Sequence, residues 1–154
     1  MRKPGSARTS TLPERRFLQL AVLLAGVVPV SAGAAGVVLG VSLLANAAPG
    51  SDLDSHFRYL SGLLLAIGLA FWIMVPRIEI QGVKFRLLGS VVVLGGLGRL
   101  AGVFLVGPPS RSMLLTLVME LGLMPLLCLW QARVAALAVA GAAPFRLRAG
   151  ALAR

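Results

Sequence analysis

The sequence predicts an all-α fold in which four transmembrane helices form an antiparallel bundle of a polytopic membrane protein. Hydrophobic residues make up 58% of the 154 residues and charged residues only 13%, whereas an ordinary soluble domain carries about 25% charged residues. The apolar residues are gathered in runs of about 20, the length that crosses a bilayer as a helix. Basic residues flank these runs, which is the charge pattern of a multi-pass membrane protein.

Four apolar runs qualify as spanning helices. They lie at about residues 18–48, 59–75, 87–107 and 112–131. All exceed the length of a barrel strand, about 9–11 residues, and none alternates between apolar and polar residues. The four runs define a spanning domain at residues 17–133, preceded by a basic tail at 1–16. Residues 134–154 form a helix extension and a second basic tail, and the sequence leaves open whether 134–144 continue the fourth helix.

The basic residues also predict an orientation. Two of them, Arg58 and Arg111, lie on one side of the predicted spans, and twelve lie on the side of both termini. The twelve are Arg2, Lys3, Arg8, Arg15, Arg16, Arg77, Lys84, Arg86, Arg133, Arg146, Arg148 and Arg154. By the positive-inside rule both termini are cytoplasmic, and anionic lipids at that face are the natural counter-charge. We expect no nucleic-acid binding, because the net charge of +10 follows from topology rather than from a basic patch interleaved with aromatic residues.

Two charges, Arg99 and Glu120, lie inside the apolar runs. Each is about eight residues from the short loop that joins the last two runs, so both are about 12 Å from the outer boundary. An unpaired charge at this depth costs about 2.5–3.5 kcal/mol, and we therefore expect the two to pair, with Thr116 adding a hydrogen bond. One interpretation is a buried ion pair that fixes helix register. The other is an outward-facing polar site for a small ligand.

Three residues at the outer end of the second run, His56, Arg58 and Tyr59, are candidates for the rim of such a site. His56 alone also fits an exposed loop residue. No paired carboxylates, activated nucleophile or metal-ligand spacing stands out, and Cys128 is the single cysteine. The sequence therefore predicts no catalytic residue, no metal and no cofactor.

Small residues are expected to mediate helix packing, because helices in lipid associate through close contact at such positions. The candidate packing residues are Gly33, Gly36, Gly40, Gly62, Gly95, Gly98 and Gly102. They serve either packing within the bundle or a face for a homodimer. Aromatic residues near the basic ends, Trp72, Phe85 and Trp130, are expected at the membrane interface.

Several strings carry a family resemblance: HFRYLSG at 56–62, PRIE at 76–79, FRLL at 85–88, LGGLGR at 94–99 and WQAR at 130–133. With these strings, residues 18–134 resemble the bacterial DUF4345 family. That resemblance implies a small four-helix membrane protein and no particular reaction. A more distant similarity to DoxX-like four-helix proteins, some of which are linked to quinone redox chemistry, is analogy at the level of the fold.

These observations favour a non-enzymatic accessory or interaction component of the bacterial inner membrane. Its partner would be another membrane protein or a second copy of the chain. The alternative is a binder or transporter of a small molecule (an anion, a lipid or a quinone) that uses the polar site around Arg99 and Glu120.

Overall fold

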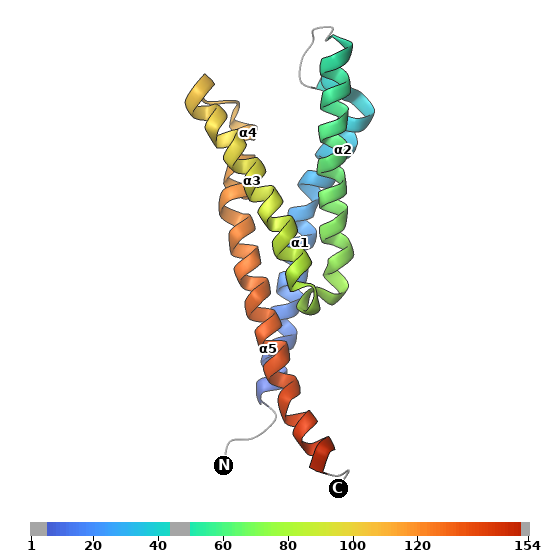
Figure 1. The fold of residues 1–154 in the computed structure, drawn as a ribbon, viewed down its shortest axis with the longest axis vertical. Coiled ribbons are helices and arrows are strands. Elements are labelled where there is room, and N and C mark those ends of the chain that lie inside the picture. Colours follow the sequence, from blue (N-terminus) through green and yellow to red (C-terminus); the bar gives the residue numbers. More distant parts are fainter. Residues whose placement is uncertain (1–5, 44–49, 152–154) are drawn as a thin grey trace. The chain divides into compact units, whose positions relative to one another are not determined.

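The computed structural model describes residues 6–43 and 50–151, and the regular structure in that part of the chain is helical (Figure 1). The elements are α1 (Ser6–Leu39), η1 (Gly40–Leu43), α2 (Ser51–Met74), η2 (Val75–Ile80), α3 (Gly82–Val106), α4 (Arg111–Val118), η3 (Met119–Leu123) and α5 (Met124–Ala151). Within them, four segments are long and apolar enough to span a membrane: Pro13–Leu43, Ser51–Ile80, Gly82–Val106 and Arg111–Ala140. The all-α class with four spanning helices is confirmed, and the chain is a multi-pass membrane protein.

The helices extend beyond the apolar runs. α2 begins at Ser51 and α3 at Gly82, whereas the sequence predicts starts near 59 and 87. Apolar runs mark only the part that crosses hydrocarbon, and polar residues add turns at either end. In α2 the added first turn carries Asp52 and Asp54, whose negative charges suit the positive end of the helix dipole.

Helices extend into both of the terminal segments that the sequence analysis set apart from the spanning domain. α1 begins at Ser6, inside the predicted tail at 1–16, and α5 continues unbroken to Ala151. Residues 134–144 therefore do continue the fourth helix. Residues 1–5 and 152–154 of the predicted tails and residues 44–48 of the first predicted helix lie outside the described part of the chain.

The chain divides into two compact units. The described residues 19–43 and 50–76 form the first hairpin, in which α1 runs against α2. The described residues 77–151, together with residues 6–18, form the second hairpin, in which α3 runs against α4, η3 and α5 (Figure 1).

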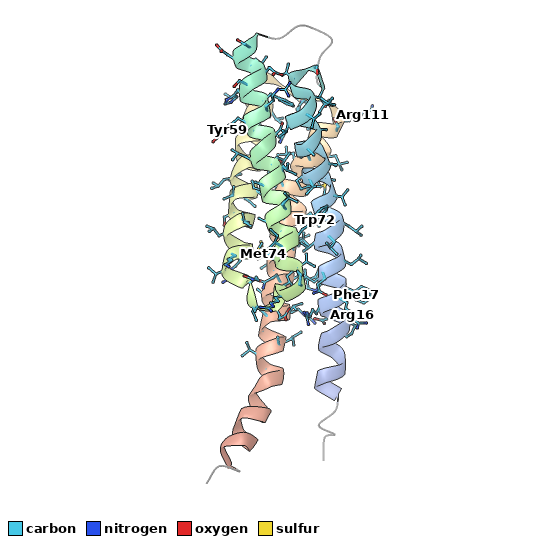
Figure 2. The ribbon with its side chains drawn as sticks, turned by 90° about the vertical axis from the view of Figure 1, so that its right-hand side faces the viewer. Arg16, Phe17, Tyr59, Trp72, Met74 and Arg111 are labelled. Carbon is cyan, nitrogen blue, oxygen red and sulfur yellow. The ribbon has the colours of Figure 1, made fainter. Side chains whose placement is uncertain are left out.

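Glycines on α1 allow the backbones of the first hairpin to approach closely. A Cβ atom at Gly33 would lie 2.6 Å from the backbone nitrogen of Leu65, and one at Gly26 would meet the Trp72 indole. The Trp72 Nε1 group donates a hydrogen bond to the carbonyl of Leu23 at 3.0 Å, and Figure 2 shows Trp72 between α1 and α2. Such contacts at small residues stabilise helix pairs in lipid, where hydrophobicity contributes little.

The end of α1 is held by two charged residues of α2. The Arg58 Nη1 atom donates to the carbonyls of Val37 at 2.7 Å and Val38 at 3.0 Å, which are among the carbonyls that a helix C-terminus leaves unpaired. The Asp54 carboxylate accepts from the Val41 backbone N–H at 2.9 Å. Gly40 has φ +64°, a conformation that glycine adopts without strain at helix ends.

The second hairpin repeats this use of glycine. A Cβ atom at Gly89 would lie 2.6 Å from the Cys128 sulfur, and one at Gly96 would lie 2.8 Å from a methyl group of Leu121. Gly82 lies against the side chain of Gln131. Positions 82, 89 and 96 are spaced by seven, as are positions 26, 33 and 40 of α1.

The fourth spanning helix contains a wide π turn at Met119–Leu123. Pro125 has no N–H group, and its ring would collide with the carbonyl of Leu121 in a regular helix. A π turn opens the helix at this point. Glu120 lies on the turn and faces α3.

Candidate functional site

Arg99 of α3 and Glu120 of η3 form a two-pronged ion pair. Arg99 donates from Nε to Oε2 of Glu120 at 3.1 Å and from Nη2 to Oε1 at 3.2 Å. Gly96, one turn before Arg99, permits this approach, because a Cβ atom there would lie 2.9 Å from the Cβ of Glu120. The exposed fractions of the side chains are 37% for Arg99 and 15% for Glu120.

The third guanidinium nitrogen of Arg99 has a weaker partner. Its Nη1 atom donates to the sulfur of Met113 in α4 at 3.1 Å, and a thioether is a weak acceptor. Thr116, expected to support the pair, instead donates from its hydroxyl to the carbonyl of Ser112 at 3.0 Å. Arg99 therefore joins two elements of the fourth span, α4 and η3, to α3.

This arrangement neutralises charge and fixes position. Each partner neutralises the charge of the other, and parallel N–H···O bonds between a guanidinium and a carboxylate constrain geometry as well as charge. A charge removed from such a pair would leave the other exposed to an apolar medium. The contact therefore joins α3 to η3 by two hydrogen bonds between charged groups.

The three predicted rim residues lie on α2, in the first hairpin. His56 and Arg58 are helical residues rather than loop residues, because α2 begins at Ser51. Arg58 contacts the end of α1 and pairs with Asp54 at 2.7 Å. Tyr59 is 63% exposed and projects outward from α2 (Figure 2), and His56 is exposed as well. The structure brings Arg58 to α1 and leaves His56 and Tyr59 at the surface of α2.

The predicted packing glycines fall into two groups. Gly33, Gly36 and Gly40 lie against α2, where a Cβ atom would meet Leu65, Ser61 or Asp54. A Cβ atom at Gly62 would have only a methyl group of Val37 near it, at 3.9 Å, and at Gly95, Gly98 and Gly102 it would meet no described atom within 4 Å.

The list of candidate packing residues does not contain the glycines by which α3 packs, Gly82, Gly89 and Gly96. Their seven-residue spacing, present also in α1 at positions 26, 33 and 40, marks them as one face of the helix, but the spacing does not tell which face of α3 meets α5. Two of the predicted interfacial aromatics also belong to the packing. Phe85 is fully buried, and Trp72 is bound to the backbone of Leu23.

A polar cluster at the basic end of the second hairpin was likewise missed. Arg15 pairs with Glu79 and Arg133 with Glu14, each at 3.0 Å. Gln131 is fully buried and donates from Nε2 to the carbonyl of Ile78 at 2.9 Å. These residues come from three separate stretches of the sequence, at 14–15, 79 and 131–133, so no local pattern connects the stretches.

Metal ligands do not gather in the part of the chain that the structure describes: it holds no group of three or more His, Cys, Asp or Glu residues suited to a metal ion. Cys128 is half-buried and lies beside Gly89. Among the charged residues of the spanning segments, Arg99 and Glu120 are the two that pair α3 with the fourth span.

The fold and this pair define an integral membrane protein with an ion pair inside its spanning helices. Residues 17–131 match the family model described as "Domain of unknown function (DUF4345)". The chain therefore belongs to the DUF4345 family. No curated protein and no solved structure matches it.

Proposed function

We propose that this protein is a non-enzymatic accessory component of the bacterial inner membrane that binds another membrane-spanning helix through α3. The observation that carries the proposal is that α3 has two glycine faces. One, formed by Gly82, Gly89 and Gly96, is used within the second hairpin. The other is formed by Gly95, Gly98 and Gly102, and a Cβ atom built at any of these three would have no contact within 4 Å among the described residues. We call it the open glycine face.

The open glycine face has the chemistry of a helix-docking surface. Small residues let a second backbone approach, and the 98–102 pair has the GxxxG spacing that recurs in such contacts. Arg99 lies among the three glycines in sequence. Its guanidinium has more N–H groups than its contacts with Glu120 and Met113 use, so a polar acceptor on a partner helix would be bound there.

The closed ion pair supports an interaction role over the alternative of a ligand-binding or transport site. Because Glu120 already balances the charge of Arg99, neither residue requires a charged ligand to be stable in the membrane. A partner helix can dock without carrying an acidic residue of its own.

The proposal includes a location and an orientation. The excess of Lys and Arg on the side of the termini supports a cytoplasmic position for both, with anionic lipids at that face. Resemblance to a bacterial family supports a location in the bacterial inner membrane. The docked partner is either a second copy of this chain or a different membrane protein.

Oxidative cross-linking in native membranes tests the docking face. In a Cys128→Ser background, a cysteine placed by Gly98→Cys should form a cross-linked product. A product of twice 16.0 kDa would contain a second copy of the chain, and a product of any other mass would contain a different protein. The matched control is Leu126→Cys, on a 63% exposed position of α5, which should remain monomeric. Equal cross-linking at both positions, or none at Gly98, would contradict the proposal.

A further inference from the structure

The first turn of α3 has unused hydrogen-bond donors. Gln81 precedes the helix, and its side chain makes no capping hydrogen bond. The Phe85 N–H bonds to the carbonyl of Gln81 at 2.9 Å, so the N–H groups before it have no carbonyl within the helix to bind. An exposed helix N-terminus of this kind favours a bound anion such as a phosphate.

A buried acceptor lies beside this turn. Gln131 is 0% exposed, and its Oε1 atom has no hydrogen-bond donor among the described residues. Leaving such an atom unpaired costs about 1–3 kcal/mol. A Cβ atom at Gly82 would lie 3.3 Å from Oε1 and 3.4 Å from Nε2. The amide group of Gln131 therefore packs against Gly82 at the place where any other residue would have its side chain.

A basic side chain reaches the same point. The Nη1 atom of Arg86 lies 3.4 Å from the position that a Cβ atom of Gly82 would take. Arg86 is exposed and forms no ion pair with a described residue. The nearest acid in the sequence, Glu79, is already paired with Arg15 at 3.0 Å. The start of α3 therefore combines a positive helix end, a guanidinium and an unsatisfied amide oxygen.

From these three features we infer that the start of α3 binds the headgroup of a membrane phospholipid that carries a hydrogen-bond donor as well as a phosphate. The phosphate accepts from Arg86 and from the free N–H groups of the first turn. A hydroxyl or ammonium group of the same headgroup donates to Oε1 of Gln131. Phosphatidylglycerol and phosphatidylethanolamine have both parts, whereas phosphatidylcholine has no N–H or O–H donor.

The location suits a lipid. Gly82 begins an apolar spanning segment, and the end of such a segment lies at the level of the headgroups. This inference rests on the proposed placement of the basic end at the membrane surface. It does not depend on the open glycine face, which begins more than three turns further along α3.

Native mass spectrometry of the full chain, released from detergent micelles that contain defined lipids, tests the inference. The first phosphatidylglycerol should bind about tenfold more tightly than phosphatidylcholine with the same acyl chains, because one hydrogen bond to a buried acceptor is gained. Arg86→Gln should weaken phosphatidylglycerol binding about tenfold, the loss of one charge-assisted hydrogen bond.

The matched control is Arg77→Gln, which removes the same charge from an exposed position at the same end of the hairpin and should leave binding within about twofold of wild type. Equal affinity for the two lipids, or equal losses in the two variants, would overturn the inference. Displacement of the lipid by millimolar inorganic phosphate would also overturn it, since the site would then bind a free anion. Cross-linking at Gly98 is measured separately, so the two proposals fail independently.

Discussion

At the scale of single residues, the contact between Arg99 and Glu120 follows from simple physics. Both residues are about eight positions from one short loop, so antiparallel helices place them at one depth, and hydrocarbon penalises leaving either unpaired. The partners of the remaining groups were not predictable. Met113 accepts from Arg99 and Thr116 bonds within its own helix, because these choices depend on side-chain rotamers around a π turn.

Charge reversal tests the pair. Arg99→Glu should sharply reduce the yield and thermal stability of folded protein in detergent, since it places two carboxylates together and each unpaired charge costs about 2.5–3.5 kcal/mol in the membrane. Adding Glu120→Arg should restore much of the loss by recreating the pair in reverse. Arg111→Glu, at an exposed position, serves as the control. A double variant no more stable than Arg99→Glu alone would show that the two residues are not coupled.

At the scale of elements, the face of each helix on which its glycines lie decides how each hairpin packs. In α1 the predicted glycines Gly33, Gly36 and Gly40 do lie against α2. α3 carries glycines on two faces, and sequence spacing alone could not tell which face meets α5. The conspicuous GxxxG at 98–102 lies on the open face, while Gly89 and Gly96 make the contacts. Only the rotation of the helix about its axis separates the two possibilities.

Adding one methyl group at each of two glycines of the first hairpin should have different effects on stability. Gly33→Ala should lower the thermal midpoint by several degrees, because its Cβ would lie 2.6 Å from the backbone of Leu65 and the helices would have to separate. Gly62→Ala, whose Cβ has only a methyl group at 3.9 Å, should be neutral or up to about 1 kcal/mol more stable through higher helix propensity. Equal effects in a thermal-shift assay would contradict this packing.

At the scale of the whole molecule, the distribution of basic residues predicts the topology. A reporter enzyme active only in the cytoplasm should be active when fused to either terminus and inactive when inserted after Pro109, in the loop between α3 and α4. The reason is that loops rich in Lys and Arg remain on the cytoplasmic side. A reporter active only outside the cytoplasm, inserted at the same sites, is the control. Activity of the cytoplasmic reporter at Pro109 would reverse the proposed orientation.

The sequence by itself determined the class of the protein, the number of its spanning helices and the shared depth of Arg99 and Glu120. All three depend on the free energy of transferring a side chain between water and hydrocarbon, which is a property of each residue type. Tertiary structure decided which glycines are covered, that Arg58 caps α1, and that Gln131 is buried beside Gly82. These depend on helix rotation and on contacts between residues far apart in the chain, so no local pattern of residues encodes them.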